Sequence, residues 1–119
     1  MKTNRMPAIA AIMALASFSL CGPAAAASFD CGKARAADER AICADRALND
    51  LDVTMSVMLK LGGHFMAMGA RGAMQDDQVA WLKARRACAA NRSCLRQSYD
   101  GRIATLQAVF DNVATHGPF

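Results

Sequence analysis

Four cysteines in a short chain set the strongest limit on its fold. Cys31, Cys43, Cys88 and Cys94 all lie beyond residue 30 of a 119-residue chain, and only Cys21 precedes them. An even number of cysteines in a small domain outside the cytoplasm is typical of a disulfide framework. Four cysteines allow three pairings, and we favour Cys31–Cys43 with Cys88–Cys94 because each of these pairs brackets one helix start or turn. Closing the larger loop, of about 13 residues, contributes on the order of 3 kcal/mol in the chain-entropy model.

A metal or redox site fits these cysteines less well. Zinc sites use closely paired Cys-x2-Cys or His ligands, whereas His64 and His116 stand apart in this sequence. A thioredoxin-like redox site requires Cys-x-x-Cys, which the sequence lacks. We therefore expect two structural disulfides, with no metal and no cofactor.

The first 27 residues have the pattern of a signal peptide. A short basic region with Lys2 and Arg5 precedes an uncharged, apolar run at 9–20, which is too short to span a bilayer comfortably. Small residues in Ala-x-Ala spacing end at Ala27 and predict cleavage before Ser28. Residues 28–119 would then form the mature protein, exported to the periplasm or beyond and not inserted in the membrane.

Cys21 opens a second interpretation, a lipoprotein anchored through that residue. The residue before a lipidated cysteine is normally small, but here it is the bulky Leu20, and Phe18 stands where Leu or Val is usual. We favour cleavage at Ser28 and keep the lipid anchor as the alternative.

Loss of the leader bounds both size and charge. It would leave 92 of the 119 residues, enough for one domain with a small core that benefits from disulfides. Two of the 14 Lys and Arg leave with the leader, so 12 basic residues face 10 acidic ones and the net charge is +2. That balance, together with export, argues against nucleic-acid binding.

Apolar residues recur at helical spacing through the mature part, and no useful strand-like alternation occurs. Asp45 is placed to cap the second helix, and Asn91 or Ser93 to cap the last. Gly62 and Gly63 are expected to end the second helix, before a flexible, Gly- and Met-rich connection at 64–74. The fold class is thus all-α: a small disulfide-stapled bundle with helices at 36–43, 46–61, 73–89 and 94–113.

Polar and aromatic residues share the apolar face of the third helix. Gln78, Trp81, Arg85 and Cys88 follow one another at spacings of three and four. We expect Trp81 to pack in the core with Tyr99 of the last helix. A buried arginine needs a partner, and we favour Asp52 for Arg85.

These motifs resemble the LprI-type family of bacterial secreted proteins, named for a lysozyme-inhibiting lipoprotein. Its Gln-x-x-Trp-x-x-x-Arg-x-x-Cys pattern corresponds to residues 78–88. Its Cys-Leu-x-x-x-Tyr-x-x-Arg-Ile pattern corresponds to residues 94–103 and includes Tyr99 and Arg102. The opening Asp-Cys, Glu-x-x-Ile-Cys and Leu-Asp steps lie within residues 30–52. Ala36 departs from the family, which usually has a Ser or Thr cap there.

The resemblance implies an exported protein-binding domain, with lysozyme as the candidate partner. Glycoside hydrolases work through two carboxyl groups in a cleft, and His64 and Arg71 in the 64–74 connection are our candidate contacts to such groups. The alternative is a non-inhibitory structural or assembly protein that binds another envelope component. Ser, His and acidic residues form no ordered catalytic set, so we do not expect an enzyme.

Overall fold

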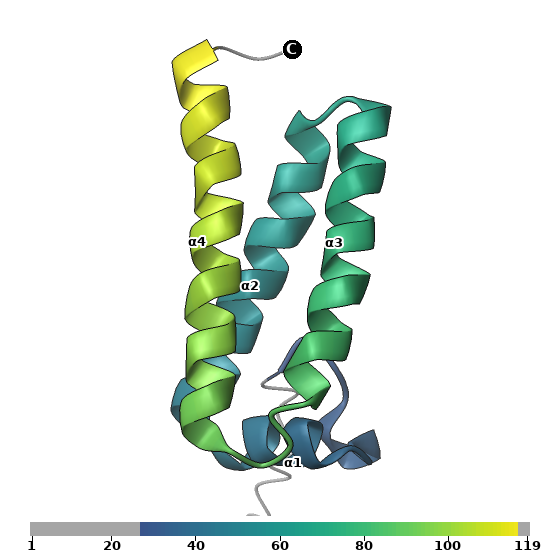
Figure 1. Cartoon of the computed structure of the whole chain (residues 1–119), viewed down its shortest axis with the longest axis vertical. Helices are drawn as coiled ribbons and strands as arrows, with labels where there is room; N and C mark the ends of the chain where they lie inside the picture. Colours follow the sequence, from purple (N-terminus) through teal and green to yellow (C-terminus); the bar gives the residue numbers. More distant parts are fainter. Residues whose placement is uncertain (1–26, 117–119) are drawn as a thin grey trace, which may run out of the picture.

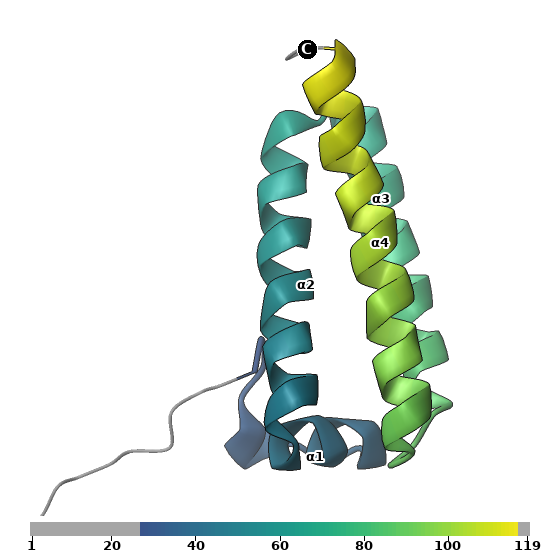
Figure 2. The ribbon, with the colours of Figure 1, turned by 90° about the vertical axis from the view of Figure 1, so that its left-hand side faces the viewer.

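The computed structural model describes residues 27–116 as five helical elements. The long helices α2 (Arg46–Phe65), α3 (Met68–Arg86) and α4 (Arg92–His116) run alternately up and down side by side, and the short α1 (Ala37–Ala44) lies across their lower end (Figures 1 and 2). No strand occurs between residues 27 and 116, so the all-α prediction is confirmed. In chain order the elements are η1 (Cys31–Lys33), α1 (Ala37–Ala44), α2 (Arg46–Phe65), α3 (Met68–Arg86) and α4 (Arg92–His116).

Some sequence-based expectations fall outside this range. The predicted leader up to residue 26, with Cys21, and the last three residues of the chain are not among the described residues. Within the described part, no helix is long and apolar enough to cross a bilayer.

Both disulfides form with the favoured local pairing. Cys31–Cys43 ties η1 to α1, with a Cα–Cα distance of 5.7 Å. Cys88–Cys94 joins the two sides of the turn between α3 and α4, with a Cα–Cα distance of 5.5 Å. The two bonds therefore lie toward the end of the bundle where α1 crosses it.

Side-chain caps define where the long helices start. The Asp45 carboxylate accepts hydrogen bonds from the backbone N–H groups of Ala47 and Leu48, at 2.9 and 3.2 Å. The Asn91 side chain accepts from the Cys94 backbone N–H at 3.0 Å. These bonds satisfy donors that a helix start leaves unpaired. The Asp45 cap was expected from the sequence, and Asn91 is the one of the two candidates, Asn91 or Ser93, that caps the last helix.

The prediction of a flexible connection over 64–74 is wrong. Helix α2 continues through both glycines to Phe65, and α3 begins at Met68, so only Met66 and Ala67 separate the two helices. Gly62 is buried, and a Cβ there would lie 3.6 Å from the Met74 sulfur. Packing of α2 against α3 and α4 thus offsets the roughly 1 kcal/mol by which each glycine disfavours a helix.

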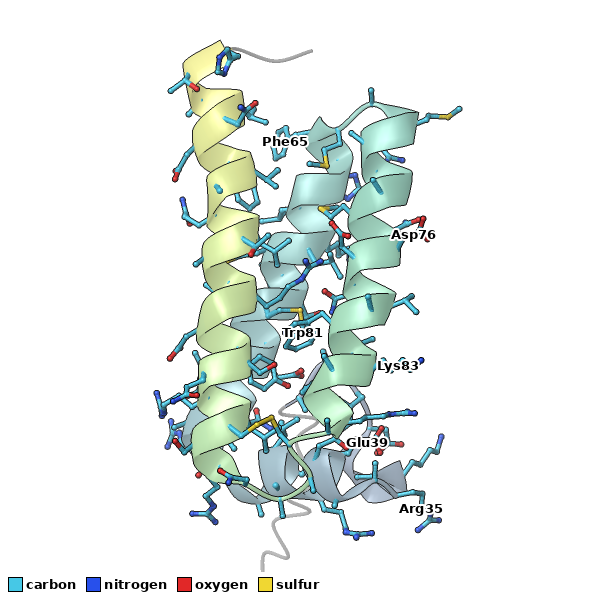
Figure 3. The ribbon with its side chains drawn as sticks, in the orientation of Figure 1. Arg35, Glu39, Phe65, Asp76, Trp81 and Lys83 are labelled. Atoms are coloured by element: carbon cyan, nitrogen blue, oxygen red, sulfur yellow. A yellow bond between two sulfur atoms is a disulfide. The ribbon has the colours of Figure 1, made fainter. Side chains whose placement is uncertain are left out.

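The core lies where the apolar stripes of α2 and α4 meet each other and α1. Tyr99, Leu95 and Ile42 are fully buried, and Trp81 packs against this group from α3. Figure 3 shows Trp81 between the helices, whereas Asp76 and Lys83 on the same helix point outward. The buried apolar side chains are Ile42, Leu48, Met55, Met74, Leu95, Tyr99 and Leu106.

Candidate functional site

Four side chains from four helices form a buried polar group near the lower end of the bundle, which we call the Arg85 cluster: Asp38, Asp52, Arg85 and Tyr99. Arg85 Nε donates to Asp38 Oδ2 at 3.0 Å, and its Nη1 lies 3.7 Å from Asp52 Oδ1. Both carboxylates are at most 1% exposed. A charged group in such a place is stable only when it is paired and hydrogen-bonded.

Tyr99 connects the two charges of the cluster. Its hydroxyl donates to Asp52 Oδ1 at 2.8 Å and accepts from Arg85 Nη1 at 3.0 Å. Burial raises the pKa of Tyr99 well above its ordinary value; Asp52 adds to this rise and Arg85 opposes it. The phenol therefore stays protonated and acts as a fixed bridge.

Aromatic rings surround the Arg85 guanidinium. It lies 5.6 to 6.0 Å from the ring centroids of Phe29, Trp81 and Tyr99. The Trp81 and Tyr99 rings meet edge to face at 5.2 Å, and Trp81 Nε1 donates to the Ser98 carbonyl at 3.1 Å. These contacts hold the guanidinium in a low-dielectric setting, where its ion pairs are strong.

The prediction that Arg85 pairs with Asp52 is confirmed but incomplete. Asp38 is the closer partner, and this pairing was not predicted from the sequence. Asp38 lies 47 positions from Arg85, so only the packing of α1 beneath α3 brings the two together. The signal that was available is the position of Asp38 four residues before Ile42, on the buried face of α1.

A second polar layer lies further up the bundle. Arg102 Nε donates to Gln78 Oε1 at 2.8 Å, and its Nη2 donates to the Met74 carbonyl at 3.3 Å. Gln78 in turn donates to the Met55 sulfur at 3.3 Å. Burial lowers the pKa of Arg102, with Asp77 acting in the opposite direction. The layer joins α2, α3 and α4 at mid-height.

Both layers are closed to solvent and fully paired. Among the described residues no buried side-chain nitrogen or oxygen lacks a hydrogen-bond partner. No three Cys, His, Asp or Glu side chains in the described part are grouped so as to hold a metal ion. The five residues Gln78, Trp81, Arg85, Tyr99 and Arg102 are therefore placed to hold the helices together.

A shallow depression at the other end of the bundle contains the two predicted partner contacts. His64 and Arg71 line it together with Lys60, Gln75 and other residues of α2 and α3, and its volume is about 440 Å³. Both contacts were expected in a loop, and this placement is wrong. His64 is in the last turn of α2 and Arg71 is in the first turn of α3.

Lys60 and Gln75, which also line this depression, were not predicted from the sequence. Each lies four residues from a predicted contact, Lys60 before His64 and Gln75 after Arg71, so each shares a helix face with it. That spacing was visible in the sequence, but continuous helix through 62–65 and 68–75 was needed to use it.

An apolar groove lies beside the turn between α2 and α3. It is lined by Phe65, Met66, Ala67 and Ala70 on one side and by residues of α4 such as Val109 and Val113 on the other, with a volume of about 430 Å³. The Phe65 ring meets Phe110 edge to face at 6.4 Å yet remains 50% exposed. We call the depression and the groove together the tip surface.

An exposed apolar stripe continues from the tip surface down α2. Val53, Val57 and Leu61 follow one another every four residues and are 40–50% exposed. This spacing places them along one side of the helix, in line with Phe65. The stripe and the groove give α2 an apolar face that the described residues do not cover.

The chain is similar to Lipoprotein LprI. The proteins of that name from Mycobacterium bovis and Mycobacterium tuberculosis are each 29% identical to it over 96 residues, covering 78% of this chain. The match covers 47% of each relative, so the chain spans about half the length of the curated relatives it matches. No protein-family profile and no solved structure matches the chain.

The motifs that carry the LprI resemblance correspond mainly to the interior. Arg85, Tyr99 and Asp52 form the Arg85 cluster, and Gln78 and Arg102 form the layer above it. The resemblance in these motifs therefore reflects how the helices are held together, and none of the motif residues lines the tip surface.

Proposed function

We propose that this protein is an exported binding protein that engages a protein partner through the tip surface, and that lysozyme is the partner to test first. The observation that carries the proposal is the convergence of His64, Arg71 and Lys60 in one depression beside an apolar groove. The similarity to Lipoprotein LprI, named as a lipoprotein, supports a location in the cell envelope. The choice of lysozyme as the partner rests on the resemblance of the sequence motifs to the LprI-type family.

The chemistry of the tip surface suits an acidic cleft. Three basic side chains on adjacent turns can donate hydrogen bonds to carboxylates, and Gln75 adds a neutral donor and acceptor. The catalytic site of a glycoside hydrolase holds two such carboxyl groups. The exposed Phe65 of the neighbouring groove can supply the aromatic anchor that protein interfaces favour.

Electrostatic attraction over long distances does not assist this encounter. Residues 28–119 carry a net charge of +2, and many animal lysozymes are basic. Binding would therefore depend on short-range contacts and apolar burial at the tip surface, and complex formation should be slow compared with an electrostatically steered pair.

A turbidity assay tests this function. The purified, oxidised protein in molar excess is expected to slow the clearing of bacterial cell-wall suspension by lysozyme. The His64→Ala/Arg71→Ala variant should weaken the inhibition at least tenfold. The matched control is Lys83→Ala/Arg86→Ala, which removes two exposed cationic side chains from the other end of α3 and should leave inhibition intact. An unchanged clearing rate with the wild-type protein would remove lysozyme as the partner.

The apolar stripe on α2 favours a second candidate, a structural or assembly protein that binds another envelope protein without inhibiting an enzyme. Val53, Val57 and Leu61 extend the apolar face well beyond what is needed to fill a catalytic cleft. Val57→Lys should abolish capture of an envelope protein in a pull-down and leave lysozyme clearing unaffected. If Val57→Lys captures the same protein as wild type, the stripe is not the contact.

A further inference from the structure

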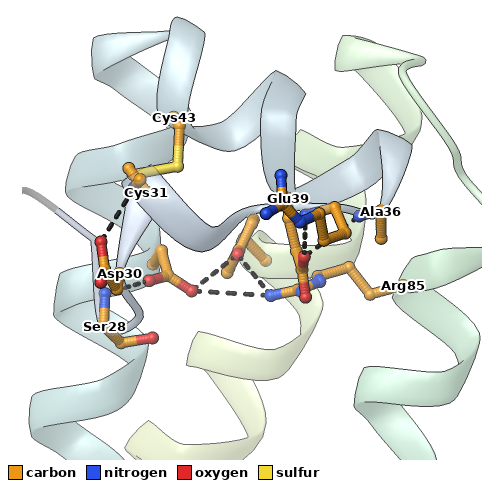
Figure 4. The surroundings of a disulfide bond; sticks show 11 residues. Ser28, Asp30, Cys31, Ala36, Glu39, Cys43 and Arg85 are labelled. Atoms are coloured by element: carbon orange, nitrogen blue, oxygen red, sulfur yellow. Dashed lines mark hydrogen bonds and ion pairs between the residues drawn. A yellow bond between two sulfur atoms is a disulfide. The ribbon is translucent and has the colours of Figure 1, made fainter.

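The Arg85 cluster contains one more contact, from the backbone nitrogen of Ser28. That nitrogen lies 2.6 Å from Asp52 Oδ2, and the other oxygen of the same carboxylate accepts from Tyr99. Figure 4 shows Ser28 and Arg85 on opposite sides of this group of contacts. Asp52 itself is fully buried, so the donor of this bond forms part of its charge compensation.

The charges of the cluster do not balance without a second cation. Two carboxylates, Asp38 and Asp52, face the single guanidinium of Arg85. The nearby buried Arg102 does not correct this, because its guanidinium binds Gln78 and the Met74 carbonyl. A neutral amide at residue 28 leaves one buried negative charge without a matching positive charge, whereas an ammonium group at the same position makes the cluster neutral.

We propose that Ser28 is the first residue of the mature protein and that its α-ammonium group is the second cation of the Arg85 cluster. Hydrolysis of the Ala27–Ser28 peptide bond consumes one water molecule. It leaves a carboxylate on Ala27 and an amine on Ser28, and the amine takes up a proton. Signal cleavage thus turns a neutral N–H donor to Asp52 into a charged one and strengthens that hydrogen bond.

The residues after Ser28 hold its nitrogen in place. The Phe29 ring lies 5.8 Å from the Arg85 guanidinium, and Cys31 is tied to α1 by its disulfide. Asp30 accepts from the Gly32 backbone N–H at 2.9 Å and so caps η1. Ser28 as a residue is exposed, while its backbone nitrogen reaches the buried carboxylate of Asp52.

The first test is the mass and N-terminal sequence of the protein recovered after export. A mature chain that begins at Ser28 with a free amine is the expected result. A chain that begins elsewhere, including a lipidated Cys21, would overturn the proposal. Because neither this test nor the next uses lysozyme, the outcome is separate from that of the proposed function.

The second test compares two oxidised forms that differ by one residue, one beginning at Ser28 and one retaining Ala27. The extra residue moves the ammonium group away from Asp52 and restores a neutral amide. The form with Ala27 should unfold with an equilibrium constant about tenfold larger, the difference between a charge-assisted and a neutral hydrogen bond. Equal stability of the two forms contradicts the proposal.

Two controls make the cause specific. In an Asp52→Asn background the two forms should have equal stability, because the charged acceptor is gone. Acylation of the α-amine at neutral pH should be several-fold slower for the Ser28 form than for the Ala27 form, since an ion-paired ammonium is a poor nucleophile. This comparison of acylation rates needs no amino-acid substitution, so it tests the ion pair even if Asp52→Asn does not fold. Equal acylation rates count against the ion pair.

Discussion

Replacing Arg85 with methionine gives the most direct test of how this small domain is held together. The change keeps a long, flexible side chain but removes the guanidinium that pairs with Asp38 at 3.0 Å and with Asp52 at 3.7 Å. It also leaves the Tyr99 hydroxyl without one of its two partners. Two buried carboxylates would then share the core with no guanidinium between them.

The expected loss of stability is large. Arg85 is 4% exposed and the carboxylates are almost completely buried, so solvent cannot replace the lost partner. Removing one member of a buried ion pair reduces the free energy of unfolding by about 3–5 kcal/mol. A domain of this size has a total of roughly 5–14 kcal/mol. The melting temperature should therefore fall by at least about 12 °C.

Urea denaturation followed by fluorescence measures this loss, because the chain has one tryptophan. Trp81 packs edge to face on Tyr99 at 5.2 Å and reports directly on the core. Far-ultraviolet circular dichroism provides a second probe, because Trp81 lies close to Arg85 and its fluorescence also responds to the substitution itself. The matched control is Arg86→Met, one residue along the same helix and exposed, which should change the free energy of unfolding by less than about 0.5 kcal/mol.

A loss below about 1 kcal/mol for Arg85→Met would refute the reasoning, because it would mean that the carboxylates need no cationic partner. A double variant sharpens the test. Adding Asp38→Asn to Arg85→Met should recover part of the lost stability, since it neutralises one of the two unpaired carboxylates. Further destabilisation by Asp38→Asn in that background would indicate that packing, and not charge, accounts for the effect.

Two further changes test local features of the helices. A Cβ added at Gly72 in α3 would meet no neighbouring side chain within 4 Å. Gly72→Ala should therefore raise the free energy of unfolding, measured by urea denaturation, by about 0.5–1 kcal/mol. A lower free energy of unfolding would show that the helix cannot accept a side chain there. Backbone N–H groups of Arg35 and Ala36 lower the pKa of Glu39, so its contribution to stability is present above pH 4.5 and is lost as the pH falls through its folded-state pKa. Glu39→Gln keeps a hydrogen-bond acceptor but removes the charge. It should reduce the acid-induced loss in the free energy of unfolding by less than about 1 kcal/mol, measured by urea denaturation at a series of pH values. If the loss of stability at low pH is unchanged in Glu39→Gln, that loss comes from other carboxyl groups.

Local sequence patterns were sufficient to predict the helical content and most helix starts. Asp45 and Asn91 cap the expected helices because a cap depends only on the next three residues. The disulfide pairing was predictable for the same reason: each bond closes a short loop around one turn or helix start. These features are set by contacts between residues close together in the chain.

Local patterns failed where distant packing outweighs intrinsic preference. Gly62 and Gly63 have low helix propensity, and the sequence alone therefore predicted a helix end. In the folded chain Gly62 is buried beside Met74, and α2 continues. The candidate contacts His64 and Arg71 were expected in a loop, whereas both lie on helices and line one depression; Lys60 was missed because its position depends on that continuation.

The sequence by itself determined that this chain is a helical, disulfide-bonded domain with apolar faces at regular spacing, because periodicity and short loops are written in neighbouring residues. Only the tertiary structure decided which charges meet in the interior. Asp38 reaches Arg85 across 47 positions, and the Ser28 nitrogen reaches Asp52 across 24. Such pairs form because α1 lies across the lower end of the long helices and the segment before it lies beside α2, and that placement depends on how whole helices pack.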